Sequence, residues 1–203
     1  MTELIPYINY LKKNNELPKH ITHQQYLQLR TLPSQTYSTI KLKNNMQEFI
    51  KKRDELLIDF MWETGGRVTD LCNVTKKDID FDQKVLKLSI KKTSKLITIN
   101  LSQEMLYDIS LFYNLFPDKE PFSMTRQNAW ERVRKYGKML NIHLHPHMFR
   151  HGLAVFLLYN GIPIEMIAYR LGHANSMTTA KYYLVITPEI EKRMFVNKNI
   201  VFR

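Results

Sequence analysis

The stretch "HPHMFRHGLAVFLLYNG", residues 145–161, places three histidines and an arginine within seven residues and then continues as an apolar segment. Pro146 favours an extended approach, and the spacing that follows predicts a helix over 147–160. His147 and Arg150 are three residues apart, so they share one face near the helix N-terminus. Unpaired N–H groups and the helix dipole at that end favour an anion. The pattern therefore indicates a phosphate-binding helix start.

A zinc site is the second interpretation of these histidines. His143, His145 and His147 fall on one face if "HLHPH" is extended, and His173 can complete a ligand set. The sequence has no further cluster of cysteine or carboxylate at ligand spacing. We therefore favour the anion, and we expect neither a metal nor another cofactor.

The composition narrows the partners. The chain has 203 residues, is 44% hydrophobic and carries a net charge of +11, so it can bury one core and attract a polyanion. No apolar run approaches the roughly 20 residues that a membrane span needs, which favours nucleic acid over a membrane; a soluble protein that is merely basic is the plain alternative. The lone cysteine, Cys72, fits a reducing compartment and is expected in the core.

The hydrophobic pattern predicts a mainly α fold with one small antiparallel sheet, an α+β arrangement. Residues 46–64 have helical apolar spacing, and Gly65 and Gly66 end that helix. Alternation within 78–101 predicts two or three short antiparallel strands with "KKTSK" at a turn.

More helices are expected on either side of these strands. In the first, Thr22 is the cap and Gln25 takes the capping-box position, with Pro18 and Pro33 bracketing the segment. In a later one, Pro163 opens the helix that follows the apolar segment.

A basic helix is expected between the strands and the histidine stretch, with Ser123 as its cap. A basic face of this length fits a DNA groove, while a solvated charged face is an equal alternative. The residues that would contact DNA are Arg126, Arg132, Lys135 and Lys138.

Arg67 occupies a second helix start, directly after "TGG". Asp70 stands three residues later and can fix the Arg67 guanidinium. The alternative is a plain buried ion pair with no further role.

Together these stretches resemble the catalytic domain of the tyrosine recombinase, or phage integrase, family. The resemblance covers about residues 19–185 and depends on the order of the motifs, since each alone is weak. The stretches are "ETGGRVTDLCNVTKKDID", "KKTSKLITINL", "HPHMFRHGLAVFLLYNG" and "LGHANSMTTAKYY".

The resemblance implies roles for individual residues. Arg67 and Arg150 match the two arginines that hold the scissile phosphate, and His173 matches a third donor. His147 begins the family's His-x-x-Arg box, and Tyr182 matches the nucleophile.

Other assignments leave neighbours in competition. Lys92 matches the hairpin lysine, with Lys91 and Lys95 as rivals, and Asp70 stands where the family usually has Glu. Tyr183 adjoins the expected nucleophile and is expected to pack against the domain instead.

The implied chemistry needs no metal, because two guanidinium groups and imidazole donors stabilise the charge that grows on a pentavalent phosphate. The resemblance implies that His147 accepts the tyrosine proton and that Lys92 protonates the departing 5′-oxygen. The product is a 3′-phosphotyrosyl link, which a second DNA strand can reclaim.

The organisation expected from the resemblance has three parts: a tail or linker (1–18), a catalytic domain (19–187) and a C-terminal segment (188–203). That segment either is exchanged between subunits or packs onto its own domain. Either this is a catalytic domain separated from a DNA-clamping domain, or it resembles the short fimbrial-switch invertases. Double-stranded DNA, a homotetramer on that DNA and a cytoplasmic location are expected. The alternatives are a type IB topoisomerase-like DNA relaxer and a catalytically retired DNA-binding protein.

Overall fold

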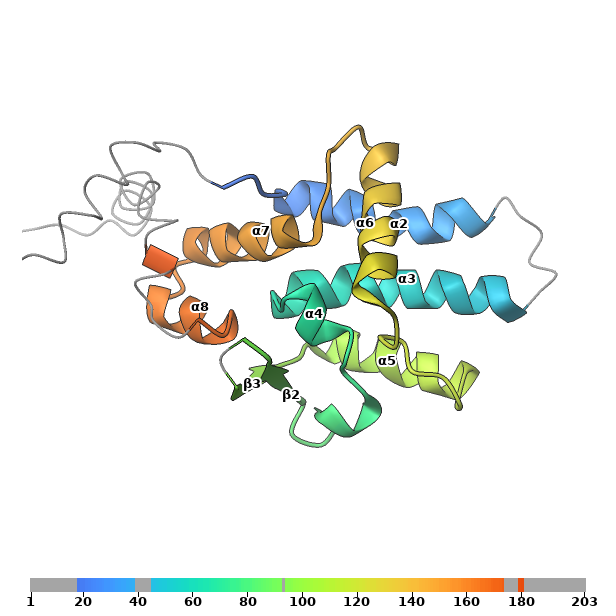
Figure 1. The fold of residues 1–203 in the computed structure, drawn as a ribbon, viewed down its shortest axis with the longest axis horizontal. Coiled ribbons are helices and arrows are strands. Elements are labelled where there is room, and N and C mark those ends of the chain that lie inside the picture. Colours follow the sequence, from blue (N-terminus) through green and yellow to red (C-terminus); the bar gives the residue numbers. More distant parts are fainter. Residues whose placement is uncertain (1–17, 39–44, 93, 174–178, 181–203) are drawn as a thin grey trace, which may run out of the picture.

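Helices dominate the structure, a computed structural model that describes residues 18–38, 45–92, 94–173 and 179–180. A three-stranded antiparallel sheet accompanies them, so the predicted mainly α fold with a small sheet is confirmed (Figure 1). The helices are α2 (His23–Ser38), α3 (Asn45–Thr64), α4 (Val68–Leu71), α5 (Gln103–Leu115), α6 (Arg126–Met139), α7 (Pro146–Tyr159) and α8 (Ile164–Arg170), with a short 3-10 turn at Lys76–Asp78.

Helix α3 is the centre of the packing. It contacts α2, α5, α6 and α7, and Figure 1 shows α2 beside it and α6 crossing in front. Its buried stretch includes Phe60, which stacks on Phe122 with ring centroids 4.1 Å apart. Tyr136 from α6 and Phe112 from α5 are also almost fully buried. The apolar spacing seen over 46–64 therefore serves one core that α3 shares with these four helices.

The sheet contains β1 (Ile79–Asp80), β2 (Val85–Ile90) and β3 (Lys95–Asn100) in that order. Cross-strand pairs on its buried side join Leu86 to Ile99 and Leu88 to Ile97. The predicted strands and the turn at "KKTSK" are confirmed. Because β2 and β3 meet at that turn, the hairpin carries its lysines to one end of the sheet.

Two predicted helix boundaries are wrong. Helix α2 continues through Pro33 to Ser38, because Pro33 and Tyr37 are buried and packing of α2 on α3 and α6 outweighs the lost backbone bond. The N-cap of α6 is Thr125 rather than Ser123, since its hydroxyl accepts the Asn128 N–H at 3.1 Å. The Thr22–Gln25 capping box of α2 is present as predicted.

The end of α3 is set by Gly65, whose φ of +61° suits glycine. A β-carbon there would lie 2.7 Å from Leu171 and 2.8 Å from Leu153. The chain therefore turns sharply at this point, with α7 and the end of α8 packed close against the turn. Among the described helices, none is long and apolar enough to cross a membrane.

Candidate active site

Arg67, the first expected phosphate ligand, lies at the turn between α3 and α4. It is the N-cap residue of α4, and its side chain is 20% exposed. Nη1 lies 3.8 Å from Oδ2 of Asp70, an ion pair too long for a hydrogen bond. Among the described residues, Nη1 has no hydrogen-bond partner. The contact with Asp70 is therefore loose, and the guanidinium keeps hydrogen-bonding capacity for an anion.

Arg150 reaches the same turn from α7. The residue is buried, and its Nη1 donates a 2.8 Å hydrogen bond to the backbone oxygen of Gly65. Because Gly65 precedes Arg67 by two residues, this bond brings the two arginines to one turn. Arginine stays charged inside proteins, and low dielectric strengthens its attraction for an anion.

His173 lies three residues beyond the end of α8. Its Nδ1 is 2.6 Å from the hydroxyl oxygen of Thr179, which is fully buried. When Nδ1 accepts the hydroxyl proton, Nε2 carries the ring proton and can donate it to a phosphate oxygen. The Thr179 contact therefore orients the imidazole for the expected role.

The electrostatic surroundings of His173 place it near the other expected residues. Burial and neighbouring positive charges lower the pKa of His173 to about 4, burial being the larger cause. The charges responsible are, in decreasing order, those of Arg150, Arg67, His151 and Lys92. A region in which every named charge is positive favours an anionic ligand.

His147 shares this environment. Burial lowers its pKa below the ordinary value, and nearby positive charges lower it further. Those charges are, in decreasing order, Arg150, His145, Arg67 and Arg126. His147 is therefore neutral at neutral pH, the state in which an imidazole can accept a proton.

The β2–β3 hairpin is joined to the Arg67 turn by Asp70. The backbone N–H of Lys91 donates to Oδ1 of Asp70 at 3.2 Å, and Asp70 is buried. The next residue, Lys92, has a charge that acts on His173. Asp70 therefore links the expected hairpin lysine to the Arg67 turn.

The structure thus brings together five of the six expected catalytic residues. We call this set the cationic cluster: Arg67, Lys92, His147, Arg150 and His173. Tyr182, the sixth, and its rival Tyr183 lie outside the described residues. Thr179, three positions before Tyr182 in the sequence, contacts His173 of the cluster.

The zinc alternative gains no support from the described residues. Within them, no group of three or more His, Cys, Asp or Glu side chains is arranged to hold a metal ion. The His145 ring stacks on Trp130 with centroids 5.9 Å apart, and its centroid lies 6.5 Å from that of His147. The His145 ring therefore packs on an indole face.

A profile of the phage integrase family matches residues 19–188. The chain belongs to this family. The tyrosine recombinase XerA of Pyrococcus horikoshii is 30% identical over 151 residues, which cover 69% of this chain and 53% of that protein. The tyrosine recombinase XerD of Haemophilus influenzae is 28% identical over 200 residues, covering 90% and 63%. The chain thus spans between about half and two thirds of these relatives.

Solved structures support the family fold. A crystal structure of XerA recombinase matches with a TM-score of 0.69 at 20% identity, covering 92% of this chain and 65% of that chain. The XerH site-specific recombinase bound to its difH substrate matches with a TM-score of 0.63 at 18% identity, covering 82% and 51%. The fold that carries the cationic cluster is therefore that of a tyrosine recombinase catalytic domain.

Helix α6 of this phage integrase domain divides its basic residues between two roles. Arg132 donates a 3.1 Å bond to Oδ2 of the fully buried Asp54, so its guanidinium is already engaged. Lys135 lies over the ring of Tyr37, with Nζ 5.0 Å from the centroid. Arg126 begins the helix and acts on His147. The N-terminal end of α6, where Arg126 lies, therefore extends the positive charge of the cationic cluster.

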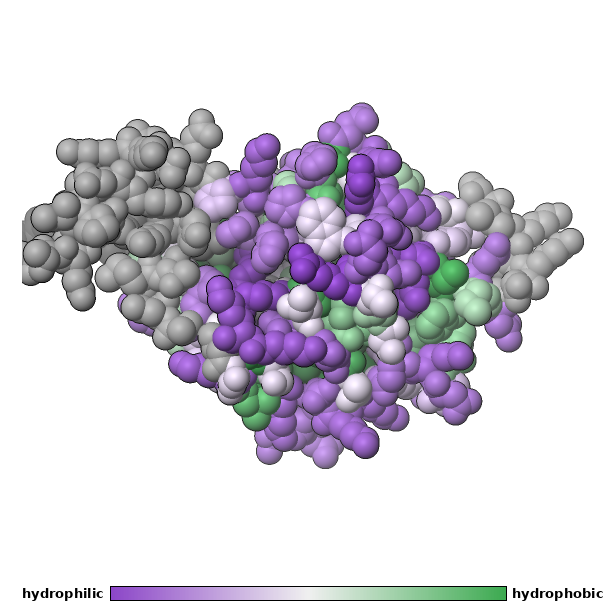
Figure 2. Space-filling model, in the orientation of Figure 1, coloured by the Kyte–Doolittle hydropathy of each residue, from purple (hydrophilic) through white to green (hydrophobic). Residues whose placement is uncertain are grey.

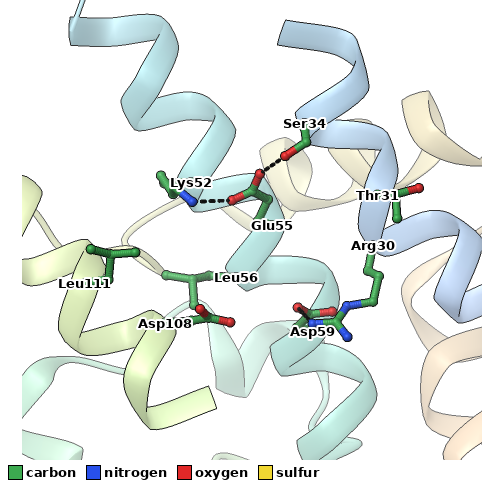
Figure 3. Close-up of a pocket in the computed structure, with 9 residues that line it drawn as sticks. All are labelled: Arg30, Thr31, Ser34, Lys52, Glu55, Leu56, Asp59, Asp108 and Leu111. Atoms are coloured by element: carbon green, nitrogen blue, oxygen red, sulfur yellow. Dashed lines mark hydrogen bonds and ion pairs between the residues drawn. The ribbon is translucent and has the colours of Figure 1, made fainter. Parts of the chain in front are cut away.

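A separate pocket lies between α2, α3 and α5 (Figure 3). Its volume is about 400 Å³. Arg30 pairs there with Asp59 at 3.2 Å, and Lys52 pairs with Glu55 at 3.0 Å, while Asp108 faces the pocket from α5 (Figure 3). Mixed charges that pair within the pocket distinguish it from the cationic cluster.

The sequence did not reveal the groups that position the expected residues. Thr179 orients His173, and the Gly65 carbonyl accepts from Arg150. The hydroxyl was detectable as the "TT" pair between His173 and Tyr182, while the carbonyl has no side-chain signal. Arg170, which donates three bonds to backbone oxygens near the site, stood unremarked in "YRLGH".

Proposed function

We propose that this chain cleaves and rejoins double-stranded DNA through a 3′-phosphotyrosyl intermediate, as a site-specific recombinase or integrase. The observation that carries the proposal is the cationic cluster, in which two arginines share one turn with two histidines and a hairpin lysine nearby. The supporting facts are the family membership and the bond that ties Arg150 to the Arg67 turn.

The phosphate is held before and during the reaction by charge. The guanidinium groups of Arg67 and Arg150 and the Nε2 proton of His173 bind its non-bridging oxygens. Attack adds a second negative charge to the phosphate, and donors already in place stabilise that charge without reorganising. Removing one such donor in other enzymes costs about 10²–10³ in rate.

Proton transfer completes the step. The Tyr182 hydroxyl gives its proton to the neutral His147 as its oxygen forms a bond to phosphorus. The bond from phosphorus to the 5′-oxygen breaks, and Lys92 gives a proton to that oxygen. One P–O bond forms for each one that breaks, so a 5′-hydroxyl of a second strand can reverse the step without ATP.

Double-stranded DNA would lie across the face on which α6 runs. Hydrophilic residues cover most of this face (Figure 2), and the net charge of +11 suits a polyanion. The proposal includes the three-part organisation expected from the sequence, a homotetramer on DNA with segment 188–203 exchanged between subunits, and action in the cytoplasm.

The test is a trap for the covalent intermediate. The protein is incubated with nicked duplex fragments of its source genome, and protein–DNA adducts are separated on denaturing gels. We expect adducts with wild-type protein and none with Tyr182→Phe, which should still bind DNA. Adducts that persist in Tyr182→Phe and vanish in Tyr183→Phe would place the nucleophile one residue later, against the proposal.

A second arm of this experiment separates recombination from topoisomerase-like relaxation, which uses the same cleavage chemistry. Two plasmids that carry the trapped site are incubated with the protein, and the products are scored for joined molecules. Recombinant product supports a recombinase. Relaxed plasmid alone would favour the relaxer.

A further inference from the structure

The C-terminal end of α3 presents backbone carbonyls that the helix itself cannot satisfy. The last carbonyls of any helix have no intrahelical N–H partner. Here the chain leaves the helix at Gly65, so these oxygens point toward the segments that approach from α7 and α8. Arg150 takes the oxygen of Gly65. The backbone oxygen of Glu63, two residues earlier, accepts hydrogen bonds from a second guanidinium.

That second guanidinium belongs to Arg170, the last residue of α8. Its Nε and Nη2 donate to the Glu63 oxygen at 3.0 and 2.7 Å, and Nη2 also reaches the Asn100 oxygen at 3.2 Å. One side chain therefore joins the end of α3, the end of β3 and the end of α8. A cation also suits the negative end of the α3 dipole.

Further contacts pack the C-terminal end of α8 against the sheet. The Tyr169 hydroxyl accepts the Thr98 N–H of β3 at 3.2 Å. Gly172 has a φ of +61°, and a β-carbon there would lie 2.9 Å from Ile90 of β2. Figure 1 shows α8 beside these strands. The residue that follows Gly172 is His173, so its backbone position is fixed by these contacts.

We propose that Arg170 is a positioning residue, which holds His173 and the Arg67 turn in register for phosphate binding by clamping the carbonyls of Glu63 and Asn100. Arg170 makes no contact with the phosphate in this scheme. The inference rests on the proposed function for its effect on cleavage, but the placement of His173 is testable without DNA.

Lysine is the informative substitution. Arg170→Lys keeps the charge but loses the planar fork that serves two carbonyls at once. We expect single-turnover cleavage at saturating DNA to fall by about tenfold to 10²-fold, since small misplacements of reacting groups cost this much. The DNA dissociation constant should stay within about twofold, because the DNA-facing charges are unchanged.

A second readout follows His173 directly in the protein without DNA. Its titration is measured by NMR from the imidazole proton signals. In the wild type the His173 pKa is about 4, and we expect it to rise toward the ordinary value in Arg170→Lys as water reaches the ring. Arg30→Lys is the matched control, because Arg30 also ties three helices together through charged bonds, away from the cluster.

The outcomes are separable. Cleavage at the wild-type rate, or a His173 titration that matches the wild type, overturns the positioning role. An equal loss of cleavage in Arg30→Lys would also overturn it, by showing a general effect of stability. If the wild type cleaves no DNA, the proposed function fails, and the NMR titration alone then decides whether Arg170 positions His173.

Discussion

Two sets of arginines in this molecule have opposite surroundings. Arg30 and Arg132 each lie within 3.2 Å of a carboxylate, and Asp54, the partner of Arg132, is fully buried. In the cationic cluster, Arg67 has only a 3.8 Å approach to Asp70, and the charges that shift the pKa of His173 are all positive. The first set resembles the charge pairing of ordinary structural networks, whereas the second gathers several positive charges around a single turn, where Asp70 is the loosely paired carboxylate.

This contrast separates arginines that are paired within the fold from arginines that can bind a ligand. A guanidinium that carboxylates already bind has little capacity left for a ligand, and removing its partner leaves an uncompensated charge. Like charges held close together raise the free energy of the folded protein. An anion that binds among them lowers that free energy again. Substitutions in the two sets should therefore affect different properties.

The largest effect on stability is expected at Asp54. It accepts bonds from Tyr136 at 2.6 Å and Arg132 at 3.1 Å, so Asp54→Ala leaves the buried Tyr136 hydroxyl and the half-buried Arg132 guanidinium without their acceptor. Breaking a buried pair in this way costs about 3–5 kcal/mol. Urea unfolding measures the loss. A change below about 1 kcal/mol would mean that the pair contributes no more than an exposed one.

Arg67→Ala should show the reverse pattern. We expect DNA cleavage to fall by about 10²–10³-fold, as for loss of one donor to a developing oxyanion. The free energy of unfolding should change by less than about 1 kcal/mol, since its one ion pair is long. Rates come from adduct formation on the trapped DNA site. A variant that cleaves normally, or that unfolds as readily as Asp54→Ala, contradicts the distinction.

The pH dependence of stability should also differ between the two regions. His173 has a folded pKa of about 4, below its ordinary 6.5, so the unfolded chain binds more protons between these values and stability rises with pH. Asp59 has a pKa raised by burial to about 6 from 3.8, so its contribution falls as pH rises through that window.

Two substitutions separate these slopes. His173→Gln should flatten the rise of the unfolding free energy between about pH 4 and 6. Asp59→Asn should steepen it, since its opposing contribution is removed. Chemical unfolding at a series of pH values measures both. Parallel curves for wild type and variants would show that neither group has a shifted pKa.

The smallest effect is expected in DNA affinity. Arg126→Ala should reduce the slope of log affinity against log salt by about one, as for loss of one phosphate contact. Arg132→Ala should leave that slope unchanged, because its guanidinium is engaged by Asp54. Fluorescence anisotropy on a nonspecific duplex gives both slopes. Equal slopes for the two variants would contradict the assignment of Arg126 to DNA and of Arg132 to the fold.

Much of the fold was predictable because its signals are local. The helical spacing of 46–64, the alternation within β2 and β3 and the Thr22 cap each depend on neighbouring residues. The end of α2 was not predictable in this way. Proline locally favours the end of a helix, but packing of α2 against α3 and α6 outweighs that preference at Pro33.

The site shows the same limit. The motifs identified the members of the cationic cluster, since the order of boxes along the chain is itself informative. The carbonyl partners of Arg150 and Arg170 are backbone atoms of residues far away in sequence. No side chain marks these carbonyls, so only the folded chain shows that Arg150 and Arg170 both bond to the turn after α3. The pairing of Asp54 with Arg132 could not be predicted from the sequence either, because the two residues are 78 positions apart.

In the proposed mechanism, the cationic cluster activates one phosphate for attack by Tyr182. The most direct measurement is mass spectrometry of the adduct trapped on nicked DNA, after nuclease digestion leaves a short nucleotide on the protein. The account predicts a 3′-phosphate linked to Tyr182, with no adduct in Arg150→Lys under the same conditions. A nucleotide found on Tyr183, on a histidine, or on Tyr182 at undiminished yield in Arg150→Lys would contradict it.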